Sequence, residues 1–416
     1  MAELGSAVYP DSVNIRGYKP NTSVHMGQLK RALKMLKKAK KPLFLAGGGV
    51  NIARANGVFT EVVEKTQVPV VTTIMGRGAI PTNHPLFVGN LGMHGAYGAN
   101  MAVSECDLLF SIGTRFNDRI TGKLHQFAPN AQIVHIDIDT ASISRNIHVD
   151  VPIVADAKEA ITKMNEYVEK CETKKWTKKI EEWKMEHPLT MKNRQAMGPQ
   201  DIIEEINRQF DNAIIATDVG QHQMFITQYI EITKNKQLIT SGGLGTMGFG
   251  FPAAIGAKIA NRDKDVVLVT GDGGFQMNIQ EMATAVTQGT NITICLLNNY
   301  YLGMVRQMQE LFYGKRYSAT CLRKRPGCPN DCKGPNEACP KYTPDFVKLA
   351  EAMGAEGVRA STREEFKEAF AKALKSGHPV VIDCQIDSDD KVWPMVNPGG
   401  SIEDAFDKSD LEAQAR

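Results

Sequence analysis

Residues 271–304, GDGGFQMNIQEMATAVTQGTNITICLLNNYYLGM, hold two polar motifs that each follow an apolar run. DVVLVT leads into Gly-Asp-Gly, and ITICLL leads into Asn-Asn. One helix length separates the two runs, which is the arrangement of a strand–helix–strand unit in a parallel sheet. The carboxyl ends of parallel strands form the crevice where ligands bind, so we expect Asp272 and Asn298 or Asn299 to meet there.

The chemistry of these residues predicts a site for a metal and a diphosphate. Carboxylate and amide oxygens suit magnesium or calcium rather than zinc, and magnesium leaves positions open for phosphate oxygens. Gly271, Gly273 and Gly274 carry no Cβ, so backbone amides can approach an anion closely. The helix that follows points its N-terminus at the same place. Either motif alone is more often a turn, but the pair at this spacing is similar to the thiamin diphosphate signature.

Composition limits the class of protein. A chain of 416 residues predicts two or three domains. Its 42% hydrophobic and 23% charged residues are ordinary for a globular protein, and a net charge of +3 favours neither nucleic acid nor a membrane surface. The basic run 29–41 is expected to be the solvated face of a helix. No apolar run of about 18 residues and no secretory signal are found, so a cytoplasmic location is expected.

Strand and helix patterns alternate twice along the chain. We expect buried parallel strands at 42–48, 68–73, 107–113, 132–139 and 151–156, and then at 213–220, 237–241, 265–271, 292–298 and 379–387. The fold class is therefore α/β, with two doubly wound parallel-sheet domains. The expected boundaries are a linker at 1–20, a central domain at 21–165, a connector at 166–198, a second domain at 199–387 with an insertion at 321–341, and a tail at 388–416.

The first domain has three motifs that suit a nucleotide. AGGG (46–49) ends a strand and suits close approach of a pyrophosphate, although three glycines also suit a tight turn. A second strand end carries Arg115 and Arg119, which are otherwise surface ion-pair residues. The acids of IDID (136–139) could hold ribose hydroxyls, and Asp139 could equally be a helix N-cap.

The second domain has two further motifs beside the predicted metal site. DVGQHQM (218–224) ends a strand, and its Gln221 and His222 could donate to phosphate oxygens. SGGLGTMGFGFPAAIGA (241–257) is rich in glycine and then helical, so a cofactor could pack closely there. Met247 could lie under a cofactor ring or fill the core.

Five stretches of the sequence together carry a family resemblance. GGLGTMGFGFPAAIGA, DVGQHQM, GDGGFQMNIQE, LNNYYLGMVRQMQELFYGKRYS and GNLGMHGAYGAN resemble the catalytic subunit of acetohydroxyacid synthase (acetolactate synthase), over roughly residues 8–400. The resemblance implies a transferase that uses thiamin diphosphate, Mg²⁺ and FAD. It implies that pyruvate is decarboxylated and its two-carbon unit is transferred to pyruvate or 2-ketobutyrate, the first common step of valine, leucine and isoleucine biosynthesis.

The resemblance also implies roles for individual residues. The implied magnesium ligands are Asp272, Asn299 and the carbonyl of Tyr301. The implied thiamin diphosphate residues are Gln221, His222, Gly245, Met247, Gly271, Gly273, Gly274, Met277 and Met304. The implied FAD residues are Gly47, Gly48, Gly49, Leu91, Gly92, Met93, His94, Gly113, Arg115, Asn117, Arg119, Asp137, Ile138 and Asp156. Arg119 and Met308 are the implied substrate residues, with Arg119 gripping the carboxylate of the acceptor.

Three departures from the family pattern matter. The family has an earlier α/β domain that carries the glutamate that activates the cofactor, and MAELGSAVYPDSVNIRGYKP resembles the linker after it. We therefore expect a fragment, a split-gene half or a degenerate chain, inactive alone unless the missing domain is supplied in trans. The segment 321–341 is inserted. Met308 stands where the family typically has tryptophan, which predicts a weaker preference for 2-ketobutyrate.

The insertion contains a cluster of cysteines with the pattern C-x6-C-x3-C-x6-C. Cys321, Cys328, Cys332 and Cys339 could hold zinc or an iron–sulfur cluster, although zinc ribbons usually show C-x2-C pairs. Reactive thiols and disulfides are the alternatives.

Other classes of function stay open beside the leading one. They are another thiamin diphosphate-dependent 2-keto acid carboligase or decarboxylase, and a non-catalytic cofactor-binding module. The family implies 2-keto acid substrates, a homodimer or larger assembly and room for a regulatory small subunit, with no nucleic acid or membrane partner.

Overall fold

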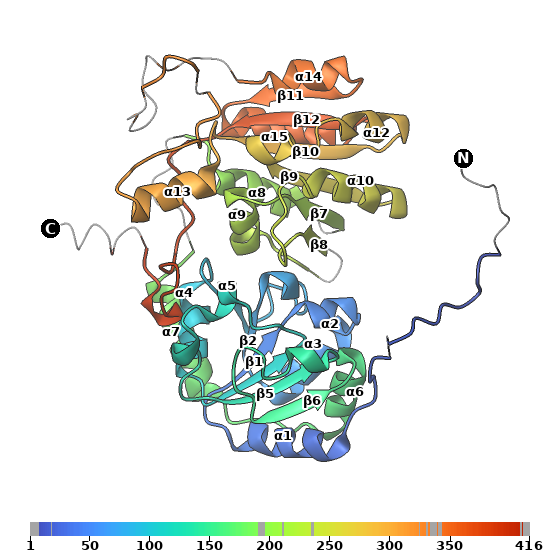
Figure 1. Ribbon diagram of the computed structural model, residues 1–416, viewed down its shortest axis with the longest axis vertical. Helices are drawn as coiled ribbons and strands as arrows, with labels where there is room; N and C mark the ends of the chain where they lie inside the picture. Colours follow the sequence, from blue (N-terminus) through green and yellow to red (C-terminus); the bar gives the residue numbers. More distant parts are fainter. Residues whose placement is uncertain are drawn as a thin grey trace.

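Two parallel six-stranded sheets, each covered by helices on both faces, make up the protein (Figure 1). The computed structural model describes residues 8–17, 19–189, 196–209, 212–233, 237–323, 325–329, 332, 339, 343–407 and 410. Every strand pair within the two sheets is parallel. The predicted α/β class with two doubly wound parallel sheets is confirmed.

The first sheet has the strand order β3-β2-β1-β4-β5-β6. Its strands are β1 Pro42–Ala46, β2 Val70–Thr72, β3 Phe87–Asn90, β4 Leu108–Ile112, β5 Gln132–Asp137 and β6 Val151–Val154. Its helices are α1 Met26–Lys38, α2 Gly48–Ile52, α3 Asn56–Thr66, α4 Tyr97–Glu105, α5 Asp118–Thr121, α6 Ala157–Tyr167 and α7 Lys174–Glu186. One face packs on α1, α3 and α6, and the other packs on α4 and α7. Within the predicted connector, α7 buries Trp176 and Trp183 against this second face.

The second sheet has the strand order β11-β12-β10-β9-β7-β8. Its strands are β7 Ala213–Thr217, β8 Gln237–Thr240, β9 Asp265–Gly271, β10 Ile292–Asn298, β11 Glu356–Ala360 and β12 Val380–Gln385. Its helices are α8 Pro199–Gln209, α9 Gln221–Tyr229, α10 Gly250–Ala260, α11 Asp272–Phe275, α12 Glu281–Thr287, α13 Gly303–Phe312, α14 Phe346–Ala352 and α15 Arg363–Ala373. Helices α8, α9 and α15 cover one face of this sheet, and α10, α12 and α14 cover the other.

Two strands of the structure were not expected from the sequence. β3 and β11 are both edge strands, so each has a neighbour on one side only. β3 reads FVGN and β11 reads EGVRA, and neither has the continuous apolar run that marks a strand buried on both faces. The apolar pattern therefore found the other ten strands, including the edge strands β6 and β8, and missed these two.

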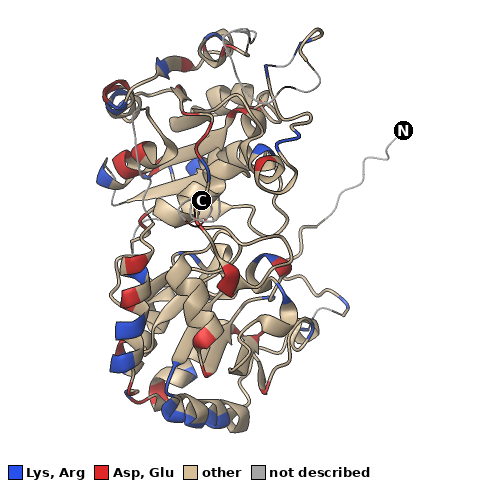
Figure 2. Ribbon diagram, turned by 90° about the vertical axis from the view of Figure 1, so that its left-hand side faces the viewer, with Lys and Arg blue, Asp and Glu red and all other residues tan. Residues whose placement is uncertain are grey.

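The charged residues lie mainly on the outer surfaces of the helices (Figure 2). In α1 the buried residues are Leu29, Ala32 and Leu36, and the lysines of the basic run point away from the sheet, as the sequence predicts for a solvated helix face. Within the described residues, no helix combines the length and the hydrophobicity needed to cross a lipid bilayer.

The two sheets are joined by polar contacts at the end of α9. Arg77, buried in the first domain, donates from Nη2 to the carbonyl of Ile230 at 2.7 Å. Thr82 and Ile232 exchange two hydrogen bonds, of 2.9 and 3.0 Å. The side chain of Gln228 donates to the carbonyl of His94 at 3.0 Å. These bonds connect the last turn of α9 and the chain that follows it to the first domain, whereas the first turn of α9 lies at the carboxyl end of β7.

Candidate cofactor site

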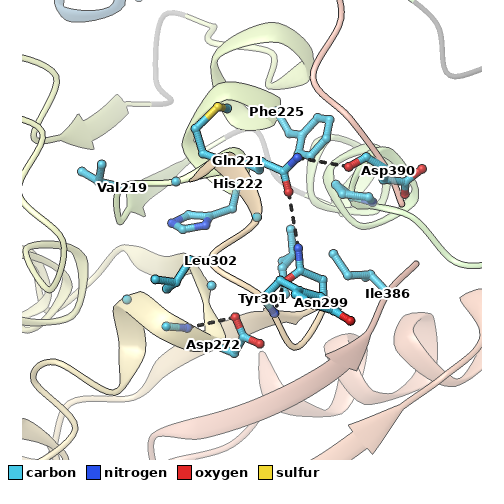
Figure 3. A pocket seen from close by; sticks show the side chains of 18 of the residues that line it. Val219, Gln221, His222, Phe225, Asp272, Asn299, Tyr301, Leu302, Ile386 and Asp390 are labelled. Atoms are coloured by element: carbon cyan, nitrogen blue, oxygen red, sulfur yellow. Dashed lines mark hydrogen bonds between the residues drawn. The ribbon is translucent and has the colours of Figure 1, made fainter. Parts of the chain in front are cut away.

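A cavity of about 580 Å³ lies at the carboxyl ends of β7, β9 and β10 (Figure 3). After β7 the chain turns outward to β8 and then returns to β9 on the other side of β7, so the strand order reverses here. Such reversal points are where open α/β sheets bind ligands. The cavity is lined by Gln221 and His222 of α9, Met247 of the glycine-rich loop, Gly271 to Gly274 at the end of β9, Asn299 and Tyr301 to Val305 after β10, and Ile386, Asp387 and Asp390 after β12, among others.

Asp272 is the first residue after β9 and lies at the N-terminus of α11. Its carboxylate is 3% exposed and accepts backbone N–H bonds from Gly273 at 2.9 Å and Tyr300 at 2.7 Å. Burial raises the pKa of Asp272 to about 7, and the nearby carboxylate of Asp383 adds to this effect. A cation in the cavity would reverse this effect, because an opposite charge stabilises the ionised form.

Asn299 follows β10 and faces the same cavity. Its Oδ1 accepts the N–H of Tyr301 at 3.0 Å, and its Nδ2 lies 3.4 Å from Oε1 of Gln221. Tyr300 between them has a φ of 65°, a conformation rare for a residue with a side chain. The sharp turn at Tyr300 brings both Asn299 and Tyr301 to the cavity, so the predicted magnesium ligands of the two strand ends lie together.

His222 lies on the other side of the cavity and has an unpaired ring nitrogen. Its side chain is buried, and Nε2 has no hydrogen-bond partner. Burial lowers the pKa of His222 to about 4, so the imidazole is neutral at physiological pH. A Cβ added at Gly220 or Gly271 would lie 2.8 Å from the ring. The two glycines therefore leave room for the imidazole. Its Nε2 can donate to a phosphate oxygen when it carries a proton, and the negative charge of a bound phosphate favours that protonated form.

The structure adds Asp218, a residue whose role the sequence did not reveal. Asp218 is 1% exposed and follows β7. Its carboxylate accepts N–H bonds from Val219 at 2.6 Å, Gly248 at 2.9 Å and Gly250 at 3.1 Å. It thereby fastens the glycine-rich loop beside the cavity. The sequence shows an aspartate at the start of DVGQHQM and glycines in the stretch 241–257, both of which are typical of strand ends and turns. Only the fold shows that Asp218 contacts Gly248 and Gly250.

Most of the residues predicted for thiamin diphosphate and magnesium come together in this cavity. Gly245 and Met277 do not line it, and the side chain of Met277 is 53% exposed. Met308 lies on α13 but also outside the lining residues. The buried free nitrogen of His222, the glycines and the oxygens of Asp272 and Asn299 fit a bound diphosphate and a hard cation. The individual assignments stay predictions.

The residues predicted for FAD follow several strands of the first sheet. Gly47 to Gly49 and Gly113 meet at the reversal point, where β1 and β4 end, whereas Leu91 to His94 follow β3 and Asp156 follows β6, the two edge strands. A Cβ at Gly47 would lie 2.2 Å from the carbonyl oxygen of Gly113, and a Cβ at Gly49 would lie 2.7 Å from the Cα of Gly113. These glycines are thus required by the contact between two strand ends. Asp156 caps α6 by accepting from Lys158 and Glu159, at 2.9 and 3.1 Å. The FAD assignment stays a prediction.

A second cavity, of about 530 Å³, contains Arg119 and lies against the tail. Met93, Asp118 and Arg119 line one side of this cavity, and residues 396–399 line the other. The side chain of Arg119 is 67% exposed and lies 3.9 Å from Asp118, the limit for an ion pair. The structure therefore places the two predicted substrate residues, Arg119 and Met308, on different elements, with Arg119 outside the first cavity.

The four clustered cysteines do not form a ligand set. In the part of the chain that the structure describes, which includes all four, no three His, Cys, Asp or Glu side chains are grouped so that they could hold a metal ion. Cys321 instead pairs through its backbone with Tyr301 in an isolated antiparallel bridge. A zinc or iron–sulfur site at Cys321, Cys328, Cys332 and Cys339 has no support from this arrangement.

Two family matches define the class of protein. Residues 29–164 match the family described as "Thiamine pyrophosphate enzyme, central domain". Residues 218–384 match "Thiamine pyrophosphate enzyme, C-terminal TPP binding domain". The chain is thus built from two domains of a thiamine pyrophosphate enzyme, and the cavity lies in the second.

Similar whole proteins identify the branch of this class. The probable acetolactate synthase large subunit of Methanocaldococcus jannaschii is 41% identical over 94% of this chain and 65% of its own length. The acetolactate synthase isozyme 3 large subunit of Escherichia coli is 40% identical over 96% of this chain and 68% of its own length. The chain belongs to the acetolactate synthase large subunit family. It spans about two thirds of the length of these relatives.

Proposed function

We propose that this chain binds Mg²⁺ and thiamin diphosphate in the cavity at the carboxyl ends of β7, β9 and β10, and serves acetolactate synthesis. The observation that carries the proposal is the convergence there of Asp272, Asn299 and the free nitrogen of His222, within a family of acetolactate synthase large subunits. The reaction is the decarboxylation of pyruvate and the transfer of its two-carbon unit to a second 2-keto acid.

Each part of the cavity has a separate task in this proposal. The bound cofactor supplies the carbon nucleophile. Asp272, Asn299 and the carbonyl of Tyr301 hold Mg²⁺, and His222 with the amides of Gly273 and Gly274 holds the diphosphate. Met304 and Met247 present apolar surface to the rest of the cofactor. FAD in the first domain and Arg119 as the grip on the carboxylate of the acceptor are parts of the same proposal.

Calorimetry of thiamin diphosphate binding with and without Mg²⁺ tests the cofactor site directly on this chain. We expect binding that depends on Mg²⁺ and is lost in Asp272→Ala, because the variant removes the only carboxylate among the proposed metal ligands. Asp263→Ala, which removes an exposed carboxylate in the loop before β9, is the matched control. Equal affinity in wild type and Asp272→Ala would show that the metal binds elsewhere.

Product analysis with pyruvate separates this function from the alternatives. Acetolactate supports the proposal, acetaldehyde points to a decarboxylase, and cofactor binding without turnover points to a binding module. The assay is run on the 416-residue chain, which we expect to be inactive alone, and on the chain supplemented with the N-terminal domain of a relative, which decides between these outcomes.

A further inference from the structure

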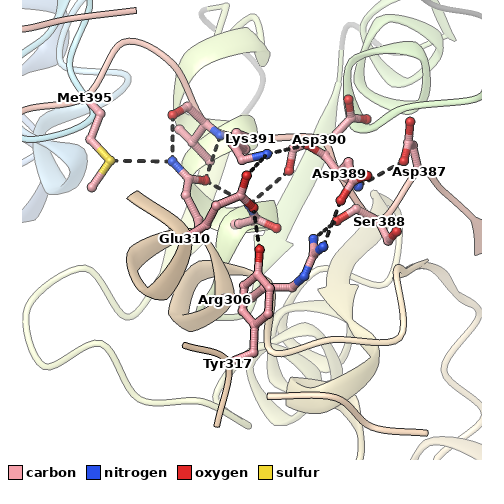
Figure 4. A network of polar contacts seen from close by, with 12 residues as sticks. Arg306, Glu310, Tyr317, Asp387, Ser388, Asp389, Asp390, Lys391 and Met395 are labelled. Carbon is pink, nitrogen blue, oxygen red and sulfur yellow. Dashed lines mark hydrogen bonds and ion pairs between the residues drawn. The ribbon is translucent and has the colours of Figure 1, made fainter. Parts of the chain in front are cut away.

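Helix α13 is fastened along its length to the segment that follows β12 (Figure 4). The guanidinium of Arg306 is buried and donates to the carbonyl of Ser388 at 2.6 Å and to Asp389 at 2.8 Å. Lys391 pairs with Glu310 at 3.2 Å. Since α13 begins in the cofactor cavity, this segment is tied to the wall of the site.

Gln307 is the buried link between α13 and this segment. Its side chain is 2% exposed, its Oε1 accepts the N–H of Val392 at 2.9 Å, and its Nε2 donates to the carbonyl of Val392 at 3.0 Å. A backbone N–H can only donate and a carbonyl can only accept. The backbone of Val392 therefore fixes which end of the Gln307 amide is oxygen and which is nitrogen.

The fixed amide of Gln307 determines the orientation of the next amide. Oε1 of Gln307 also accepts from Nε2 of Gln221 at 2.9 Å, and the same Nε2 donates to the carbonyl of Asp390 at 3.1 Å. Oε1 of Gln221 consequently faces Nδ2 of Asn299, at 3.4 Å. The Oδ1 of Asn299, the atom suited to a metal, then lies on the opposite side of its amide, where it also accepts the N–H of Tyr301 at 3.0 Å, so the two contacts support the same orientation.

A chain of three oriented amides thus connects Val392 to the metal end of the cavity. We propose that Gln307 is a positioning residue that fixes the amides of Gln221 and Asn299 for binding of the cation and the diphosphate. It touches neither ligand, and it acts through Gln221. The consequence for ligand binding rests on the proposed function, whereas the coupling between the amides is a property of the protein alone.

A double-mutant cycle on the ligand-free protein tests the coupling. Gln307→Met and Gln221→Met each keep an unbranched side chain and remove the amide, and we expect each to lower the melting temperature by roughly 2–5 °C. We expect the melting temperature of the double variant to fall by less than the sum of the two single shifts, because the bond between the two amides is already lost in either single variant. Additive shifts would overturn the proposal, since they would show that the two amides act independently.

Titration of Mg²⁺ in the presence of thiamin diphosphate tests the consequence. We expect Gln307→Met to weaken Mg²⁺ binding about tenfold, the loss of one to two hydrogen bonds. Gln309→Met is the matched control, because Gln309 is also on α13 and also donates to a loop carbonyl, that of Ser318 at 3.0 Å. Its amide oxygen accepts from Ser318 and Thr320, whereas that of Gln307 accepts from Gln221.

The outcomes distinguish this inference from the proposed function. The positioning role is overturned if the wild type binds both ligands and Gln307→Met binds Mg²⁺ with the same affinity. It is also overturned if Gln309→Met loses as much Mg²⁺ affinity as Gln307→Met. A wild type that binds neither ligand contradicts the proposed function. In that case the double-mutant cycle still decides whether Gln307 holds Gln221.

Discussion

The carboxyl group of Asp272 is buried in surroundings that disfavour its ionised form. Two backbone N–H groups stabilise the ionised form, but burial outweighs them and raises the pKa to about 7. In the ligand-free protein the group is therefore largely protonated in weak acid, and binding of a cation displaces that proton.

This pKa predicts how stability changes with pH. Between pH 4 and 7 the folded protein keeps a proton on Asp272 that the unfolded chain has released, so wild-type stability falls as pH rises through this window. The favourable contribution is complete below about pH 4 and lost above about pH 7. A rise from 3.8 to about 7 corresponds to at most about 4 kcal/mol.

The Asp272→Asn variant checks this prediction, because it cannot titrate. We expect its melting temperature, relative to that of the wild type, to increase from pH 4 to pH 7 and to stay level above. Asp263→Asn, at an exposed position, should run parallel to the wild type throughout. If the melting temperatures of Asp272→Asn and the wild type change in parallel with pH, Asp272 keeps an ordinary pKa.

Met308 carries a prediction about acceptor choice. The resemblance implies that this position lies along the acceptor pocket, where one methylene is worth roughly 1–3 kcal/mol. Methionine is flexible and holds the shape of a pocket less firmly than tryptophan. We expect Met308→Trp to raise the ratio of acetohydroxybutyrate to acetolactate in a competition assay with 2-ketobutyrate and pyruvate. An unchanged ratio would show that this side chain does not set acceptor choice.

The glycine-rich loop and α10 illustrate how one buried carboxylate organises an element. Asp218 binds the N–H groups of Gly248 and Gly250, so the start of α10 is held against the end of β7. A Cβ at Gly250 would lie 2.7 Å from the backbone nitrogen of Asp218. Six residues further along the same helix, Gly256 is exposed and has no atom within 4 Å of an added Cβ.

These two glycines make a matched pair of tests. We expect Gly250→Ala to destabilise the protein by about 1–3 kcal/mol, because the backbone must shift. Gly256→Ala should stabilise it by roughly 0.5–1 kcal/mol, because alanine is the better helix former. Denaturant unfolding measures both. Similar effects from the two variants would contradict the packing of Asp218 against this helix.

Much of the architecture could be predicted from local patterns. The apolar runs located the inner strands, and the Gly-Asp-Gly and Asn-Asn motifs located the cavity, because both follow from the end of a buried parallel strand. Asp218 and Gln307 could not be found in this way. Their partners lie 30 and 85 residues away along the chain, and a hydrogen bond between distant segments leaves no local pattern.

At the scale of the whole molecule, α9 connects the two domains. Its first residues, Gln221 and His222, line the cofactor cavity, and the chain after its last turn binds Arg77 of the first domain. Arg77 is 6% exposed, and burial lowers its pKa to about 10, so it remains charged at neutral pH. The guanidinium of Arg77 lies over the ring of Phe87, with its Cζ 5.3 Å from the ring centroid, and this contact holds the side chain in place.

Removal of the hydrogen bond between Arg77 and the carbonyl of Ile230 should weaken the attachment between the two domains. We expect Arg77→Met to leave the carbonyl of Ile230 without this partner and to cost about 1–3 kcal/mol. Scanning calorimetry should show a lower and broader transition than in the wild type. Arg31→Met, on the exposed face of α1, is the control and should leave the transition unchanged. An unaltered transition in Arg77→Met would show that the domains are held by other contacts.

The packing of glycines around the cavity limits how this protein can evolve. At Gly303 an added methyl group would lie 2.0 Å from Oε1 of Gln221, and at Gly220 and Gly271 it would meet the ring of His222. No single substitution can enlarge these positions without moving a neighbour, so the diphosphate end offers few viable mutational steps. Met304, Val305 and Ile386 also line the cavity, with flexible, half-buried or exposed apolar side chains that tolerate exchange. Descendants with altered specificity should therefore keep these glycines unchanged and vary the apolar part of the lining.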